Sequence, residues 1–305
     1  MGISRQQALD CFHSDDLIGI GMEADAVRHR LHAEGVVSYA VECAVSMPCV
    51  EDGASEASQQ SLYDEIRQMV DLGSTSVLLV GGRGSNCRIE WFEGILRGIR
   101  QRFPLLWIEG MSPAEIVVFA AESRLNLRET ISRLHDAGLD SIASNGTPST
   151  CSMAELLAVH RTAHGLGMRT TATMHFGAGE TIEQRVDLLA AVRQLQEDTG
   201  GFAAFIPLAA EALSGRELDS VTAVEQLKTL AIARIFLDNI ENIQWNAASQ
   251  GLKVLQTGLR FGANDAGSVA PKGIGASEED LRRIIRDAGF QPVQRDASYR
   301  TMFLN

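Results

Sequence analysis

The chain contains no run of 18 apolar residues, so the sequence offers no candidate for a membrane-spanning helix. It has little positive charge: 27 lysines and arginines stand against 39 aspartates and glutamates, a formal net charge of -12. That balance argues against a nucleic-acid or membrane-surface partner. The first residues, Met1-Gly-Ile-Ser-Arg-Gln-Gln7, lack the apolar segment of a secretory signal. We therefore expect a cytoplasmic protein whose partner is a small-molecule substrate.

Cysteine is scarce and scattered, with only Cys11, Cys43, Cys49, Cys87 and Cys151 in 305 residues. An odd, dispersed set in a cytoplasmic chain predicts free thiols rather than disulfides. Cys43 and Cys49 fall in one predicted loop and could bind a metal ion, but two small semi-buried side chains explain them equally simply.

Two familiar catalytic patterns are also missing. His160 and His164 lie one turn apart on a predicted helix, but the intervening glutamate of H-E-x-x-H is absent. No G-x-S-x-G elbow supports a Ser/His/Asp triad. We expect no metal site in this chain.

From Gly35 onward, apolar strands alternate with helices, the order typical of a parallel α/β fold. The predicted strands are 36–41, 76–80, 105–108, 141–144, 169–176, 202–208 and 242–245. Seven or eight strand–helix units predict a (β/α) barrel, complete or slightly open, preceded by N-terminal helices. No linker, repeat or low-complexity tract divides the chain. We predict one domain with a helical cap (1–35), a barrel core (36–268), and a C-terminal helix and tail (269–305).

Several stretches, in order along nearly the whole chain, resemble one known family. Among them are Glu34-Gly-Val-Val-Ser-Tyr39, Arg169-Thr-Thr-Ala-Thr173-Met, Glu197-Asp-Thr-Gly-Gly-Phe202, Leu259-Arg-Phe-Gly-Ala-Asn-Asp265-Ala-Gly-Ser268 and Arg286-Asp-Ala-Gly-Phe-Gln-Pro-Val-Gln-Arg-Asp296. They resemble the radical S-adenosylmethionine (SAM) superfamily, and within it the cyclic dehypoxanthine futalosine synthases of menaquinone biosynthesis. The resemblance implies a barrel of radical SAM type.

The sequence departs from this family where the family's chemistry resides. The family's three cluster cysteines, C-x₃-C-x₂-C, fall on Glu51, Ser55 and Ser58 when the spacing is counted from Tyr39, and no other segment carries the motif. A [4Fe–4S] cluster needs thiolate ligands, for which carboxylate and hydroxyl oxygens are poor substitutes. The sequence therefore predicts no iron–sulfur cluster, and it leaves SAM binding possible but doubtful.

The segment after the second predicted strand is a candidate ligand site. Gly81 and Gly82 stand where the resembled family uses a glycine pair to hold the amino group of SAM, and glycines let a backbone approach a ligand closely. A strand-to-helix turn uses glycines in any case. Arg83 follows them and could bind an anionic group of the substrate, or simply face solvent.

Three ionisable residues are candidates for acid–base catalysis. Glu109 is predicted at the end of the third strand, His175 near the end of strand 169–176, and Glu42 after the first strand. A carboxylate at an apolar barrel mouth would have a raised pKa and could exchange protons with a substrate. We predict Glu109 and His175 as a pair, although a hydrogen-bonded structural role explains each residue equally well.

Asn145, Asn264 and Asp265 follow later strands or helices and are candidate substrate-binding residues. Asn264 and Asp265 belong to a stretch shared with the resembled family. A turn role for Gly262-Ala-Asn-Asp265 is an equally economical interpretation.

Together these features predict an enzyme of radical SAM ancestry that lacks the cluster. The expected reaction is a redox-neutral cyclisation, isomerisation or elimination on a small cyclic or nucleoside-like metabolite. Two alternatives stay open: a catalytically inert partner subunit of an active radical SAM homologue, and an enzyme that binds SAM for polar, non-radical transfer. The chain could also form a homo-oligomer.

Overall fold

The computed structural model describes residues 2–47, 56–81, 89–143, 151–209, 221–246, 251–271 and 277–302. Packing divides the chain into two compact units. The larger unit comprises Met1–Ala40, Thr171–Val269 and Ile274–Asn305, and the smaller unit comprises Val41–Thr170 and Ala270–Gly273. The expectation of a single domain stays a prediction.

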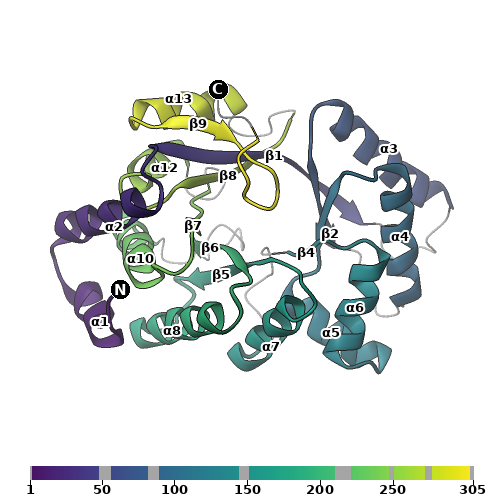
Figure 1. Cartoon of the computed structure of the whole chain (residues 1–305), viewed down its shortest axis with the longest axis horizontal. Coiled ribbons are helices and arrows are strands. Elements are labelled where there is room, and N and C mark those ends of the chain that lie inside the picture. The colour runs from purple at the N-terminus through teal and green to yellow at the C-terminus, as the bar shows by residue number, and fades with distance from the viewer. Residues whose placement is uncertain are drawn as a thin grey trace. The chain divides into compact units, whose positions relative to one another are not determined.

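Parallel strands form the centre of the smaller unit. They are the second half of β1 (Val36–Met47), β2 (Ser76–Gly81), β3 (Trp107–Gly110) and β4 (Ser141–Ile142), in the order β4-β3-β2-β1. The helices of this unit are α3 (Glu56–Asp71), α4 (Ile89–Arg102), α5 (Pro113–Ser123), α6 (Leu127–Ala137) and α7 (Met153–His164). Figure 1 shows α3, α4, α5 and α6 on the same side of these strands.

The two faces of these strands differ in character. One face packs into a hydrophobic core with the helices, and its strand residues are Cys43, Val45, Met47, Val77, Leu79, Ile108 and Ile142. Each large apolar side chain buried in this way stabilises the fold by about 1.5–3 kcal/mol. The alternate residues, on the opposite face, include Glu42, Ser76 and Glu109. The smaller unit therefore uses one sheet face for stability and presents polar groups on the other.

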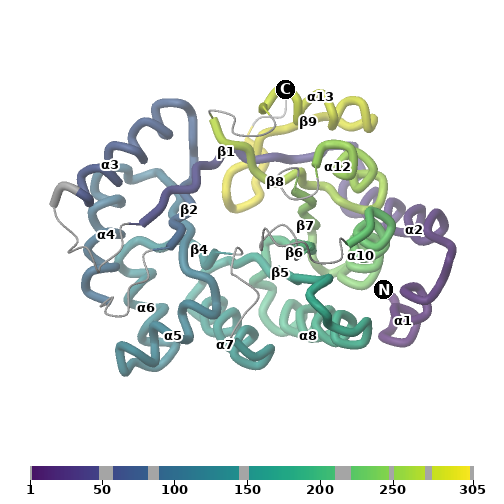
Figure 2. Tube along the Cα trace, turned by 180° about the vertical axis from the view of Figure 1, so that it is seen from behind, coloured from purple at the N-terminus to yellow at the C-terminus, as the bar shows by residue number. Residues whose placement is uncertain are grey.

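The larger unit contains the remaining elements. They are α1 (Arg5–His13), α2 (Leu17–Leu31), β5 (Thr170–Phe176), α8 (Ile182–Thr199), β6 (Phe202–Ala209), α10 (Ala223–Phe236), β7 (Asn242–Ile243), α12 (Leu252–Gly258), β8 (Asp265–Val269), α13 (Glu278–Asp287) and β9 (Gln291–Gln294). The strands β5, β6 and β7 are neighbours in that order, and β9 pairs in parallel with the start of β1. Helices α12 and α13 pack against each other, and α13 lies beside β9 (Figure 2).

Local sequence signals set several helix ends. Ser4 and Ser277 are N-caps and accept hydrogen bonds from the backbone N–H groups of Gln7 and Asp280. A cap of this kind is worth about 1 kcal/mol. Gly138, with φ +121°, ends α6 where a side chain would be strained. No helix in the described ranges combines the length and apolarity needed to cross a bilayer.

Three strand predictions need correction. β1 runs to Met47 rather than to residue 41, so Glu42 and Cys43 lie within the strand and not after it. β3 begins two residues later than expected, which places Glu109 inside it. β8 and β9 were not expected at all, because neither Asp-Ala-Gly-Ser-Val nor Gln-Pro-Val-Gln forms an apolar run. Pairing partners supplied by distant parts of the chain make these segments strands.

Candidate functional site

Strand β5 divides its side chains between two environments. Ala172, Met174 and Phe176 are buried, and the guanidinium of Arg185 on α8 lies 5.2 Å from the ring centroid of Phe176. Thr173 and His175 alternate with them and are only partly buried. Because successive strand residues point to opposite faces, Thr173 and His175 share the face that looks away from α8.

This face carries two buried polar atoms that have no partner among the described residues. Thr173 Oγ1 and His175 Nδ1 are both inaccessible to solvent and make no hydrogen bond to any residue that the structure describes. Burial lowers the pKa of His175, so the imidazole is neutral at neutral pH. Leaving a buried polar group unsatisfied costs about 1–3 kcal/mol, so such groups are rare in native proteins and call for a reason. A ligand or an ordered water molecule with complementary hydrogen-bonding groups would satisfy them.

The turn after β5 is rigidly held. Glu180 accepts hydrogen bonds from the backbone N–H groups of Gly177 (2.7 Å) and Ala178 (2.9 Å) and from Arg185 Nε (2.6 Å). Burial raises the pKa of Glu180, but these hydrogen bonds outweigh that effect and leave the pKa below its ordinary value. Arg185 also reaches Glu225 on α10 at 2.7 Å. These contacts fix the end of β5 beside His175, and no pattern in the sequence predicted them.

The polar face of the smaller unit contains the two predicted carboxylates. Glu42 on β1 accepts a hydrogen bond from Ser76 Oγ on β2 at 3.3 Å. Glu109 on β3 is in register with Leu78 and Ser141. Glu42 and Glu109 thus share a face but lie on strands separated by β2. Glu109 belongs to the smaller unit and His175 to the larger one, and their pairing stays a prediction.

Asn264 and Asp265 are buried and occupied by hydrogen bonds within the larger unit. Asn264 Oδ1 accepts from Arg234 Nη2 (2.7 Å) and from the N–H of Ile243 (2.9 Å), while its Nδ2 donates to Asn242 Oδ1 (2.9 Å). Asp265 begins β8, so the expected Gly262–Asp265 turn does not extend through it. Both residues hold strands together, and their role in substrate binding stays a prediction.

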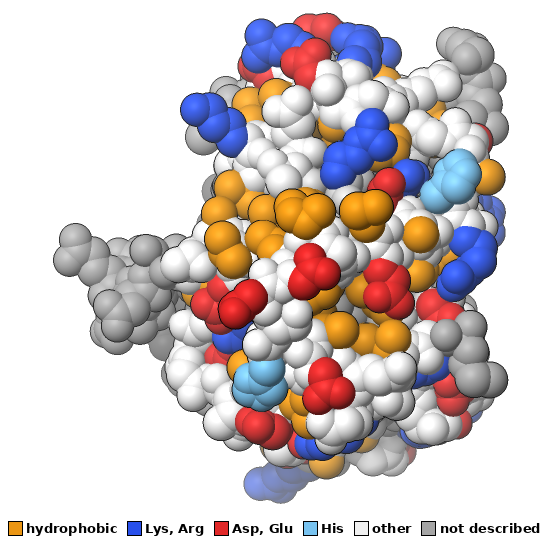
Figure 3. Space-filling view, turned by 90° about the vertical axis from the view of Figure 1, so that its left-hand side faces the viewer, with side chains coloured by type: hydrophobic (Ala, Val, Ile, Leu, Met, Phe, Trp, Pro, Cys, Tyr) orange, Lys and Arg blue, Asp and Glu red, His pale blue; other side chains and the backbone are white. Residues whose placement is uncertain are grey.

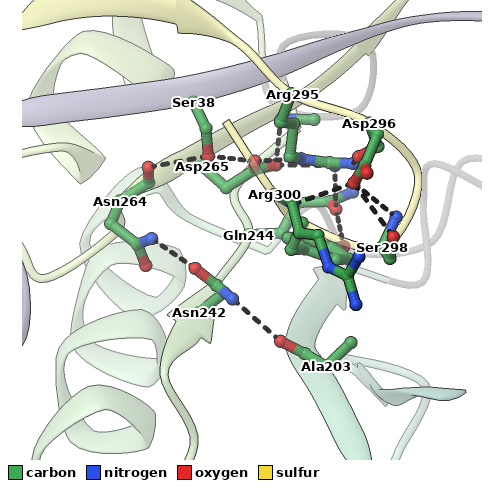
Figure 4. Close-up of polar contacts among 12 residues, drawn as sticks. Ser38, Ala203, Asn242, Gln244, Asn264, Asp265, Arg295, Asp296, Ser298 and Arg300 are labelled. Atoms are coloured by element: carbon green, nitrogen blue, oxygen red, sulfur yellow. Dashed lines mark hydrogen bonds and ion pairs between the residues drawn. The ribbon is translucent and has the colours of Figure 1, made fainter. Parts of the chain in front are cut away.

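Asp265 is the centre of a polar network that includes the C-terminal segment (Figure 4). Its carboxylate accepts from Ser38 Oγ at 2.5 Å and forms a two-pronged ion pair with Arg295. Arg295 also donates to Gln244 Oε1, which accepts a further hydrogen bond from Tyr299. Arg295 lies in one of the stretches shared with the resembled family, and that was the only available signal for this contact.

The other candidate ligand residues lie mostly outside the described residues. Gly81 ends β2 with φ +78°, a conformation that favours glycine, and a Cβ there would meet nothing within 4 Å. The positive φ, and not a lack of space for a side chain, therefore explains why glycine occupies position 81. Gly82, Arg83 and Asn145 lie outside the described residues, and their predicted roles stay predictions.

The expected absence of an iron–sulfur cluster stays a prediction, because two of the three expected cluster positions lie outside the described residues. Cys43 points into the hydrophobic core, and burial raises its pKa to about 11, so it is a thiol and not a thiolate ligand. Within the described ranges, no three His, Cys, Asp or Glu side chains converge as metal ligands. His160 Nδ1 and His164 Nε2 each lie 2.9 Å from Thr170 Oγ1. Cys49, Cys87, Glu51 and Ser55 lie outside the described residues.

Comparison with known proteins establishes the relationship. The family model "CofH/MqnC C-terminal region" matches residues 199–304. A cyclic dehypoxanthine futalosine synthase of Streptomyces coelicolor is 33% identical, over 97% of this chain and 85% of that protein. An aminodeoxyfutalosine synthase of Thermus thermophilus is 30% identical, over 98% of this chain and 92% of its own length.

A solved structure supports the fold. Methylornithine synthase covers 96% of this chain and 94% of its own, with a TM-score of 0.66 at 13% sequence identity. At that identity the likeness concerns the fold alone, and it confirms the predicted (β/α) barrel of radical SAM type. Together with the sequence relatives, it shows that the chain belongs to the futalosine-synthase-like family of the radical SAM superfamily.

Proposed function

We propose that this family member works without an iron–sulfur cluster and catalyses a redox-neutral cyclisation, isomerisation or elimination. The observation that carries the proposal is the sequence itself, in which Glu51, Ser55 and Ser58 replace the three cysteines of the cluster motif. Three thiolates are needed to hold such a cluster. Without them the chain has no means of supplying an electron to SAM, and proton transfer is the chemistry that its own side chains support.

His175 is the proposed proton acceptor. A neutral imidazole takes a proton from a substrate carbon or hydroxyl, and its lowered pKa keeps it in the accepting form at neutral pH. Return of that proton to another substrate atom by the imidazolium completes an isomerisation with no net change in electrons, and Glu109 is proposed as a second acid–base group for the substrate. Thr173 Oγ1, on the same face of β5, is placed to hydrogen-bond the same ligand.

The proposed substrate is a small cyclic or nucleoside-like metabolite. Two groups of relatives support this class by their names: the futalosine synthases, and the 5-amino-6-(D-ribitylamino)uracil–L-tyrosine 4-hydroxyphenyl transferases, one of which, from Methanococcoides burtonii, is 31% identical over 80% of this chain. A hydroxyl and a neutral imidazole suit the uncharged donors and acceptors of such molecules.

Anaerobic reconstitution with iron and sulfide tests the missing cluster. We expect no stoichiometric cluster and, with SAM and dithionite, no 5′-deoxyadenosine above a control without enzyme. A matched variant that restores the motif (Glu51→Cys, Ser55→Cys and Ser58→Cys) shows whether the fold accepts a cluster once the ligands return. About four irons per chain and absorbance near 400 nm in the unaltered protein would overturn the proposal.

Incubation with a small-molecule extract of Streptomyces coelicolor, followed by mass spectrometry, tests the proton-transfer role. We expect the protein to consume one metabolite, and His175→Ala and Glu109→Gln to slow this by roughly 10²–10⁴-fold. His13→Ala, at the exposed end of α1, is the matched control and should retain activity. Unaltered turnover in His175→Ala contradicts the assignment. The absence of any turnover, together with stable binding to an active radical SAM homologue, would favour the inert-partner alternative.

A further inference from the structure

Helix α2 has a buried face and an exposed apolar face. Ile20, Ala24 and Val27 are buried, and the helix packs extensively against α10. On the opposite side Ile18 and Met22, one turn apart, are 65% and 70% exposed. Within the described ranges the other exposed large apolar side chains occur singly on their elements, so α2 alone presents two together.

Exposed Ala26 continues this stripe by one more turn. Figure 3 looks onto the side of the larger unit that carries α1, α2 and α10. It shows hydrophobic side chains gathered in a band, with acidic side chains mostly below the band and basic ones mostly above. A contiguous apolar patch with a charged border is the usual form of a protein–protein contact surface.

The charges at the two ends of α2 have opposite signs. Asp15 and Asp16 stand at the N-terminal end, and Arg30 at the C-terminal end. Arg30 lies 3.6 Å from Asp238 but is 57% exposed, so its guanidinium can also reach outward. Such charges favour the dipole of a lone helix as well, so only their combination with the exposed apolar stripe between them indicates a contact surface.

Along α2, acidic residues are followed by the apolar stripe and then by a basic residue. Two copies of the helix with this order complement each other in only one relative orientation. When two copies of α2 lie antiparallel about a two-fold axis at Met22, Ile18 faces Ala26 of the second copy. Asp15 then lies close to Arg30 of the second copy at both ends. A parallel arrangement would instead bring like charges together. Two-fold contacts of this kind close on themselves and are the commonest way in which proteins self-associate.

We propose that the outward face of α2 is a self-association surface on which a second copy of this chain packs antiparallel, with the two-fold axis at Met22. One helix pair buries less than the roughly 1,200–2,000 Å² of total surface that is typical of stable complexes. The dimer is therefore reversible and dependent on concentration. It involves no residue of the proposed reaction and stands whether or not that proposal holds.

Sedimentation velocity of the full chain, across the micromolar to millimolar range, tests this surface. We expect a monomer–dimer equilibrium that weakens as salt is added, because two sets of opposite charges meet across the axis. Met22→Lys places two like charges at the axis and should abolish the dimer. Leu105→Lys, at a position that is 97% exposed in the smaller unit, is the matched control and should leave the dimer intact.

A charge exchange gives a second and independent test. Asp15→Lys alone and Arg30→Glu alone should each weaken the dimer by about tenfold, since each repulsion occurs twice. The double variant should restore it, because the charges then attract in the reverse sense. Circular dichroism and thermal melting of each variant check that the fold is kept. A wild-type chain that stays monomeric throughout the range, or a dimer that survives Met22→Lys, would overturn the proposal.

Discussion

Two regions of the larger unit bury polar side chains, and they treat them in opposite ways. Around Asp265 every carboxylate oxygen has partners: Oδ1 accepts from Gly267 N–H (2.9 Å) and Arg295 Nη2 (3.0 Å), and Oδ2 from Ser38 Oγ and Arg295 Nε. On β5, Thr173 Oγ1 and His175 Nδ1 are buried and find no partner in the part of the chain that the structure describes.

The difference separates structural polar groups from those that are available to a ligand. A buried ion pair is tolerated only when its hydrogen bonds are complete, so the Asp265 region is committed to holding strands and the C-terminal segment together. On the β5 face, the two unsatisfied polar atoms lower the stability of the fold, and no described hydrogen bond offsets this cost. An unsatisfied buried group in a native protein calls for an explanation, and a binding or catalytic role is one such explanation.

Asp265→Ala breaks the satisfied region and should have the largest effect. Removing the carboxylate leaves Arg295 buried without its counter-ion, which costs about 3–5 kcal/mol of unfolding free energy. Urea unfolding followed by circular dichroism measures the loss. Asp287→Ala, exposed at the end of α13, is the matched control and should change stability little. A loss below about 1 kcal/mol for Asp265→Ala would show that the ion pair adds little.

Acid should weaken the smaller unit next. Burial lowers the pKa of His160 to about 3 and that of His164 to about 4, against 6.5 for an unburied histidine. Their contribution to stability is complete above pH 6.5 and is lost as the pH falls below it, because the unfolded chain then binds protons that the folded chain does not.

The size of this acid effect can be measured residue by residue. Between pH 6.5 and about 5, His160 should account for up to about 2 kcal/mol of lost unfolding free energy. Urea unfolding over this range, in the natural protein and in His160→Gln, isolates that share. An unchanged pH dependence in the variant would show that other groups control acid unfolding.

Thr173→Val tests the β5 face, the region whose buried polar groups are unsatisfied. It removes a buried hydroxyl without a partner and keeps the shape of the side chain, so stability should rise by about 1–2 kcal/mol while ligand turnover falls. The matched control is Thr170→Val on the same strand, whose hydroxyl contacts His160 and His164. That variant should lose stability. Thermal melting compares the two, and a loss of stability in Thr173→Val would show that its hydroxyl has a partner in solution.

Gly81→Ala should give the smallest effect. At φ +78° a side chain is strained, and the variant should lose about 1 kcal/mol. Gly94→Ala within α4 meets open space in a helix and should gain roughly 0.5–1 kcal/mol. Urea unfolding measures both changes. A loss for Gly81→Ala with a gain for Gly94→Ala would show that the backbone conformation at the end of β2, and not glycine replacement in general, causes the loss.

Part of the site could be predicted from the sequence because it depends on local periodicity. The alternation along Thr170–Phe176 placed His175 near the end of a strand, and the structure confirms this. Glu42 and Glu109 were identified, but both were expected at strand ends and instead lie within strands. The residues whose partners are distant in the chain, above all Arg295 beside Asp265, carried no local signal.

The sequence by itself determined the order of the first seven strands and the family, because these depend on short-range spacing and on stretches that can be matched in order. It also contains no C-x₃-C-x₂-C motif, and the absence of a cluster stays a prediction. Only the tertiary structure decided that Asp265 is structural whereas Thr173 and His175 are unsatisfied, and that β8 and β9 are strands. Hydrogen-bond satisfaction and strand pairing depend on neighbours from remote segments, and no local pattern of residues encodes which neighbours those will be.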